Sequence, residues 1–191
     1  MAIPVSVLQS TSPGSVIELF SIQLKTALHG ANTLYRFHNG ANLNANGEVV
    51  WAGNSYLRFP IDCSGFEFGS TGTLPRPKIS ISNIFGTITA IMQDVNETTV
   101  GNDLNGATFT RIRTLARYLD AANFTGGTNP FGTPDPTAEF PQEIYFLDRK
   151  VSETRDVVTW EAQSALDLVN VKLPNRIATT EIFPGIGAFI G

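Results

Sequence analysis

The sequence predicts a mainly β protein, an antiparallel β-sandwich or distorted barrel with one or two short helices. Residues 78–82 alternate polar side chains with isoleucine, which is typical of a strand with one buried and one solvated face. Glycine and proline recur between residues 60 and 77, and both disfavour the interior of a helix. Two Asn-Gly dipeptides, at 39–40 and 46–47, favour tight hairpin turns.

The first third of the chain is expected to form strands after a short arm. Residues 1–14 are expected to be an N-terminal arm or a brief helix, because they end in the turn-like order Ser-Thr-Ser-Pro-Gly. Residues 15–24 are almost continuously apolar, which predicts a strand covered on much of both faces. Further strands are expected at 34–38, 48–51 and 55–61, with a turn at 52–54 and a meander order overall.

The next segment is expected to hold two more strands and then a helix. Phe66-Glu67-Phe68 and residues 79–82 each alternate with period two. From Asn83 the period changes, and the apolar residues fall on one side of a helix with Asn83 as its N-cap. The residues on that apolar side are Ile84, Ile88, Ile91, Met92 and Val95.

The last third is expected to hold a strand, a loop and a hairpin. Residues 107–119 predict a strand that can end in a helical turn, with Phe109, Ile112, Leu115 and Ala116 inside. Residues 126–141 are rich in glycine and proline and predict a loop that either makes a contact or moves. Residues 143–150 and 157–168 predict a hairpin; Ile144 and Phe146 share one face, and Val158, Trp160 and Ala162 share another.

Length and charge narrow the functional classes. The 191 residues suffice for one large domain or two small ones without a metal or a disulfide. Thirteen Lys and Arg stand against 17 Asp and Glu, and no basic run predicts a nucleic-acid-specific contact. We find no secretion signal and no apolar run long enough to span a bilayer, so no membrane span is expected.

The residues that most often perform catalysis lack the surroundings that chemistry needs. His29 and His38 have no partner at metal-ligand spacing and are expected on the surface or in loops. Cys63 is the single cysteine and has no histidine base near it, so a buried or half-buried thiol is expected. The carboxylates are scattered along the chain. The sequence therefore predicts that the protein is not an enzyme.

The sequence leaves two kinds of binding surface undecided. Arg111, Arg113 and Arg117 form a basic stripe that Arg76 and Arg58 can join, either as a solvated face or as an assembly interface. The alternative to an assembly role is a carbohydrate-binding β-sandwich that acts in surface recognition. Its stacking platforms would be the aromatic rings of Trp51, Tyr56 and Tyr118, although isolated aromatics in strands more often belong to the core.

Two stretches carry a resemblance to a known family. The first is the order Tyr56, Phe59-Pro60-Ile61, Gly65-Phe66-Glu67, Gly72, Arg76-Pro77, Ile79, Ile81, Asn83, and the second is the run from Ala116 to Phe124. Together they resemble the minor tail protein L family of phages with long, non-contractile tails, from about residue 15 to about residue 176. The resemblance implies a structural protein of the virion tail tip that joins the end of the tail tube to the central hub.

The resemblance also implies partners and a division of the chain. The expected partners are other copies around a threefold or pseudo-sixfold channel, the distal tail protein and the central tail hub protein, with assembly in the host cytoplasm. The expected parts are an arm (1–14), a β-rich domain (15–176) with a possible sub-domain break at 125–141, and an apolar C-terminal tail (177–191).

The end of the sequence departs from the family. Relatives usually continue past the region matched by Asn175–Ala178 into a segment whose cysteines hold an iron–sulfur cluster, and residues 179–191 contain no cysteine. A cluster needs about four thiolates, so no cluster is expected. Residues 182–191 have no charged side chain and are expected to dock on their own domain or on a neighbour. The expected interface residues are Arg76, Arg111, Arg113, Arg117, Phe131, Phe183, Ile186, Phe189 and Ile190.

Overall fold

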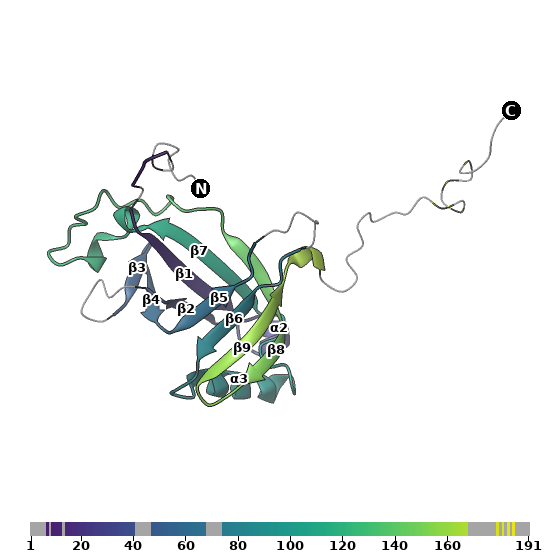
Figure 1. The fold of residues 1–191 in the computed structure, drawn as a ribbon. Helices are drawn as coiled ribbons and strands as arrows, with labels where there is room; N and C mark the ends of the chain where they lie inside the picture. The colour runs from purple at the N-terminus through teal and green to yellow at the C-terminus, as the bar shows by residue number, and fades with distance from the viewer. Residues whose placement is uncertain are drawn as a thin grey trace.

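Nine strands join into one continuous sheet in the computed structural model (Figure 1), which describes residues 7, 9–12, 14–40, 47–67, 74–167, 179, 181, 183 and 185. The strands are β1 (Val16–Gln23), β2 (Leu34–His38), β3 (Val49–Trp51), β4 (Asn54–Arg58), β5 (Ile61–Ser64), β6 (Lys78–Ser82), β7 (Thr108–Leu115), β8 (Glu143–Glu153) and β9 (Val157–Gln163). The helices are α2 (Thr26–His29) and α3 (Thr87–Thr98), with 3-10 turns η1 (Ala116–Tyr118), η2 (Ala121–Asn123) and η3 (Ala165–Asp167).

The sheet is open, with the strand order β3-β4-β2-β1-β7-β8-β9-β6-β5. Neighbouring strands run antiparallel except β2 and β4, which pair in parallel through Phe37–Leu57 and His38–Arg58. The predicted mainly β fold with short helices is therefore confirmed, as an open, sandwich-like sheet rather than a closed barrel.

Strand β1 lies between two hydrophobic cores. Phe20 and Ile22 belong to a core with Phe109 of β7, whereas Ile17 and Leu19 belong to a second core on the other face. Because successive side chains of a strand point to opposite faces, both sets of β1 residues are buried. This confirms the strand predicted at 15–24 and explains its nearly continuous apolar sequence.

The predicted meander is wrong, because β4 lies between β3 and β2. The connection from residue 39 to residue 48 is long enough for β3 to lie at the sheet edge, beyond β4. The predicted hairpin across residues 52–54 does form, with Val49 opposite Tyr56. Both residues are buried in the second core, so the burial of apolar surface favours this order over a simple meander.

The strands after β4 also differ from the prediction. β4 ends at Arg58, and β5 begins after Pro60, which has no N–H to donate to the ladder. Glu67 and Phe66 are not in a strand, and Phe68 lies outside the described residues. The Phe66 ring instead packs edge-on against Tyr145, with 5.7 Å between the ring centroids.

Helix α3 covers one end of the first core with Ile88, Met92 and Val95, as predicted. It begins at Thr87, after Gly86, whose positive φ of 68° favours glycine. The predicted N-cap, Asn83, lies further back, yet its Oδ1 accepts the Thr89 amide at 3.2 Å. Ile84 precedes the helix and is 63% exposed, so its predicted place on the apolar face is wrong.

The last hairpin, β8–β9, is confirmed, with β8 extending to Glu153. Val158, Trp160 and Ala162 of β9 are fully buried on one face. On β8 the buried residues are Tyr145 and Leu147, because their side chains point into the first core and Ile144 points outward. The helical turn expected near the end of residues 107–119 is η1.

Candidate interaction surface

The two histidines are buried, so their predicted surface position is wrong. His29 Nδ1 accepts the Lys25 amide at 2.8 Å, and Nε2 lies 3.1 Å from the Asn105 carbonyl. His38 Nδ1 accepts the Gly40 amide at 3.1 Å, and Nε2 lies 2.8 Å from the Gly47 carbonyl. The pKa of His38 is lowered, and burial of the ring is the largest cause, although the hydrogen bond with the Gly47 carbonyl raises the pKa. Both rings therefore hold neighbouring loops together.

Cys63 is half-buried in β5, opposite Ile79 of β6. Burial raises the pKa of its thiol to about 12, although the positive charge of Arg111 opposes the shift. A thiol with so high a pKa is neutral near pH 7 and is a poor nucleophile or metal ligand. The half-buried thiol expected from the sequence is confirmed.

The three aromatics considered as carbohydrate platforms all lie in the second core. Trp51, Tyr56 and Tyr118 are 2%, 4% and 9% exposed. A stacking platform needs an open ring face, which these rings do not offer. Within the described ranges, no group of three His, Cys, Asp or Glu side chains is arranged to hold a metal ion.

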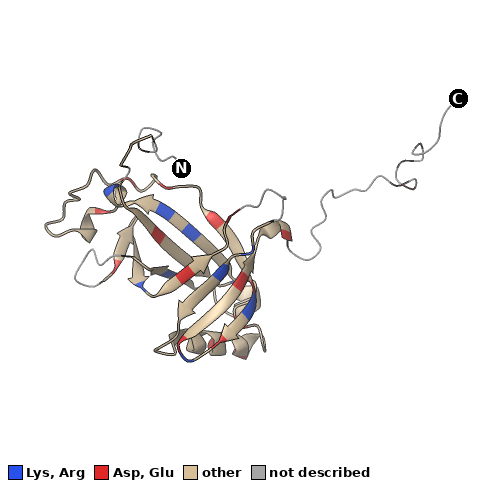
Figure 2. Ribbon diagram, viewed as in Figure 1, with Lys and Arg blue, Asp and Glu red and all other residues tan. Residues whose placement is uncertain are grey.

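Arg111 and Arg113 of β7 form a charged seam with acids on the two neighbouring strands. Because β7 lies between β1 and β8, the register sets Arg113 opposite Glu18 and Arg111 opposite Glu143. Arg111 pairs with Glu18 and, at 2.9 Å, with Glu143, while Arg113 pairs with Glu143 at 2.8 Å. Figure 2 shows the basic positions on β7 with acidic positions on the adjacent strands.

Aromatic rings cover this charged seam. The Arg111 guanidinium lies 4.4 Å from the centroid of the Phe66 ring, and the Arg113 guanidinium lies 5.3 Å from that of Phe140. The Nε atoms of both arginines are buried and make no hydrogen bond within the described part of the chain. The seam is therefore partly desolvated and matched in charge, and opposite charges matched in this way favour one register of neighbouring strands over others.

The other predicted arginines do not join this seam. Arg117 is exposed in η1, with its guanidinium 5.6 Å from the Tyr118 ring centroid. Arg76 pairs with Asp167 at 2.6 Å and lies 3.6 Å from Glu161. The four arginines thus occupy three separate environments and form no single stripe.

The loop at 126–141 is held against η1 by the buried side chain of Asn129. Asn129 Nδ2 donates to the carbonyls of Ala116, Arg117 and Leu119 at 3.0–3.2 Å. Asn129 Oδ1 accepts the amide of Phe131, whose side chain is 60% exposed. The loop therefore presents the predicted interface residue Phe131 to solvent on a fixed backbone.

The run at 116–124 secures the β3–β4 hairpin at the sheet edge. Asn123 is fully buried; its Oδ1 accepts the Val50 amide at 2.7 Å and its Nδ2 donates to the Val50 carbonyl at 2.6 Å. Asp120 Oδ2 accepts the Gly53 amide at 2.8 Å. These roles were not predicted from the sequence, because they depend on contacts between residues about 70 positions apart.

The predicted C-terminal interface residues are only partly within the described chain. Phe183 is 47% exposed, and its amide donates to the Thr179 carbonyl at 2.8 Å. Ile186, Phe189 and Ile190 lie outside the described residues, so their interface role stays a prediction. Among the helices in the described ranges, none is long and apolar enough to cross a membrane.

Comparison with known proteins places this chain among phage tail proteins. A family model described as phage minor tail protein L matches residues 26–184. Tail tip protein L of Escherichia phage lambda is 39% identical over 93 residues, which are 48% of this chain. The same match covers 37% of the lambda protein, so the chain corresponds to well under two thirds of that relative's length.

Proposed function

Because the chain belongs to the phage minor tail protein L family, we propose that it joins the end of the tail tube to the central hub of the tail tip. Family membership makes it a minor tail protein with a structural role in the virion. The observation that carries the proposal is the extent of the family match, which spans β2 to β9 and includes α2 and α3.

The proposed partners are other copies of this chain around a threefold or pseudo-sixfold channel, the distal tail protein and the central hub protein. One feature supports an assembly role, because the loop at 126–141 presents Phe131 outward on an anchored backbone. Preorganised surfaces of this kind lose little conformational entropy when they bind.

The proposed function involves no chemical reaction, and its assembly step belongs to the host cytoplasm. It also requires no iron–sulfur cluster in these 191 residues, which contain one cysteine. Cys63 does not suit cluster ligation, because burial keeps its thiol protonated. Purified protein should therefore contain no stoichiometric iron when it is prepared without oxygen and measured by elemental analysis. Iron at one cluster per chain, or per few chains, would contradict this part of the proposal.

The test of the proposed function is to locate the chain in intact particles. Electron cryomicroscopy of purified phage should show β2 to β9 in density between the end of the tube and the hub, in several copies. Particles produced without the chain should lack an attached hub. If particles lack the chain, or hold it only along the tube or in the head, the proposed joining role is wrong.

A further inference from the structure

One asparagine–glycine pair of the chain has a histidine on its reactive amide. In such a pair the glycine amide nitrogen can attack the asparagine side chain, because glycine has no side chain to block the approach. Asn39 and Gly40 form a pair directly after β2, and Asn39 is exposed. His38 Nδ1 accepts the Gly40 N–H at 3.1 Å. The attack requires the loss of that proton, so His38 lies where a general base is needed.

The second nitrogen of the His38 ring fixes which nitrogen carries the hydrogen. Nε2 lies 2.8 Å from the Gly47 carbonyl oxygen, which can only accept, so Nε2 is the donor. Nδ1 therefore presents its lone pair to the Gly40 amide. The ring is fully buried, so bulk water does not compete for Nδ1. A base that is oriented in this way by a third group is the arrangement that activates nucleophiles in proteins.

The surroundings of the ring keep it neutral near pH 7. The residues opposite His38 are Leu19 on β1 and Arg58 on β4. Burial is the largest cause that lowers the pKa of His38, and the positive charge of Arg58 lowers it further, against the hydrogen bond with the Gly47 carbonyl. A neutral imidazole can take up a proton, so His38 is available as a base over the neutral pH range.

The backbone around Asn39 is held on both sides. The His38 carbonyl accepts the Phe59 amide at 3.1 Å, and the Gly40 amide is bound by the His38 ring. Asn39 thus lies between two fixed peptide groups, while its side chain is open to water. Groups that are held close together react faster than the same groups on a flexible chain, provided that their geometry suits the reaction.

We propose that Asn39 is converted, with His38 as the base, into a succinimide and then into aspartate or isoaspartate. The Gly40 amide nitrogen gives its proton to His38 Nδ1 and forms a bond to Asn39 Cγ. The bond from Cγ to Nδ2 breaks, His38 returns the proton to Nδ2, and ammonia leaves. Water then opens the succinimide at either of its two carbonyls. The reaction requires only the folded chain and water, so it does not depend on the tail-tip role.

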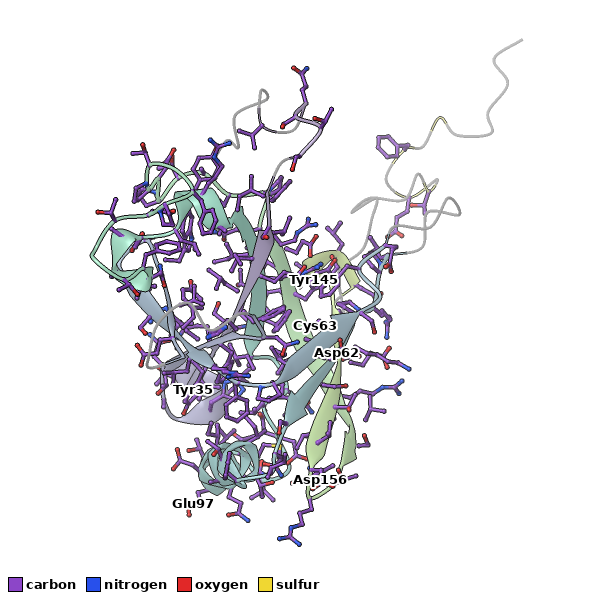
Figure 3. The ribbon with its side chains drawn as sticks, turned by 60° about the vertical axis from the view of Figure 1, so that its left-hand side comes forward. Tyr35, Asp62, Cys63, Glu97, Tyr145 and Asp156 are labelled. Atoms are coloured by element: carbon purple, nitrogen blue, oxygen red, sulfur yellow. The ribbon has the colours of Figure 1, made fainter. Side chains whose placement is uncertain are left out.

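The product changes the charge of two grooves on the surface. Asn39 lines one groove with Glu18 and another with Asp62 of β5, which is labelled in Figure 3. A carboxylate at position 39 adds a like charge to both grooves, and like charges repel. Isoaspartate also lengthens the backbone directly after β2. Conversion of Asn39 therefore alters the surface at this end of β2.

A second asparagine–glycine pair serves as a control within the same chain. The Gly106 amide donates to the Leu147 carbonyl at 2.7 Å. A backbone carbonyl accepts a hydrogen bond but does not take up a proton near neutral pH, so this amide is held without a base. Asn105 should therefore react more slowly in the folded protein than in the unfolded chain.

The test follows both asparagines while the full chain is incubated near pH 7, with peptide mass spectrometry to assign each product to its residue. Asn39 should convert on the order of tenfold faster in the folded protein than in the same chain unfolded in urea, because only the folded chain holds the base on the amide. Asn105 should show the opposite order. Conversion of Asn39 at the same rate in both states, or more slowly in the folded protein, would overturn the proposal, since the hydrogen bond would then not assist the reaction.

The variant His38→Gln separates the base from the hydrogen bonds. Glutamine can accept from the Gly40 amide and donate to the Gly47 carbonyl, but it is not a base near pH 7. The variant should lower the rate at Asn39 by roughly tenfold and leave the rate at Asn105 unchanged. An unchanged rate at Asn39 in a folded His38→Gln chain would contradict the assigned role.

The pH dependence of the parent gives a second measurement that needs no variant. In urea the rate at Asn39 should rise about tenfold from about pH 7 to about pH 8, because hydroxide is then the base. In the folded protein it should change little over the same range, because His38 is already neutral. A tenfold rise in the folded protein as well would show that hydroxide, and not His38, removes the proton.

Discussion

The Asn123 side chain is a single residue on which the β3–β4 hairpin depends. We predict that Asn123→Ala lowers the free energy of unfolding by about 1–3 kcal/mol, because the buried Val50 amide and carbonyl lose their partner. Urea unfolding followed by tryptophan fluorescence measures this change, since Trp51 lies in the same hairpin. Asn54→Ala is the matched control, because its side chain donates one exposed hydrogen bond. A loss no larger than that of the control would contradict the assigned role.

Lys150 gives the protein a small acid-sensitive contribution to stability. Its Nζ lies 2.9 Å from Asp103 and 2.7 Å from Glu153. Hydrogen bonds lower the pKa of both carboxyls. The largest effect on the pKa of Asp103 comes from the Asn96 side chain, and the largest effect on the pKa of Glu153 comes from Lys150. The stabilisation is therefore complete when the pH is above the ordinary carboxyl pKa values of 3.8 for Asp103 and 4.5 for Glu153. It is lost as the pH falls through the lower pKa values that these carboxyls have in the folded protein.

We therefore predict that Lys150→Met loses about 0.5–1 kcal/mol of stability near pH 7 and less near pH 3, the size expected for partly exposed pairs. Urea unfolding at a series of pH values measures the difference between the variant and the parent. A difference that stays constant, or grows, as the pH falls would show that the two carboxylates are not the cause.

Helix α3 depends on its contacts with the first core, because no side chain caps its first turn from the N-cap position. We predict that Met92→Ala costs about 2–5 kcal/mol, because Met92 is buried among the core side chains. Ile84→Ala should change the stability of the monomer by no more than about 0.5 kcal/mol, because Ile84 is exposed. Denaturant unfolding of both variants measures the two changes in the free energy of unfolding. Equal losses of stability would show that Ile84 is buried on the apolar face of the helix.

The whole molecule is organised by one sheet with a core on each side of β1, and we propose that the apolar C-terminal residues contact a neighbour. Five of residues 182–191 are large and apolar, and none is charged. We predict that deleting Phe183–Gly191 leaves the melting temperature near that of the full chain and prevents incorporation into tails. A large drop in melting temperature would show instead that this segment stabilises its own domain.

Strands, turns and α3 could be predicted because their patterns depend on residues close together in the sequence. Leu34–His38 forms β2 with the predicted bounds, and the Val158, Trp160 and Ala162 alternation of β9 gives its buried face directly. The continuous apolar run of residues 15–24 also indicated a strand covered on both faces, which two separate cores explain.

The pairing of distant segments could not be predicted in the same way. Three features depend on which distant segments become neighbours. They are the pairing of β4 with β2, the burial of His29 and His38, and the hydrogen bonds between Asn123 and Val50. The charged seam shows the reason most directly, because Glu18 and Arg111 are 93 residues apart and meet through the register of β1 on β7. A slip of one residue in that register would turn Arg111 to the opposite face, and the burial of the assembled strands against the two cores excludes such a slip.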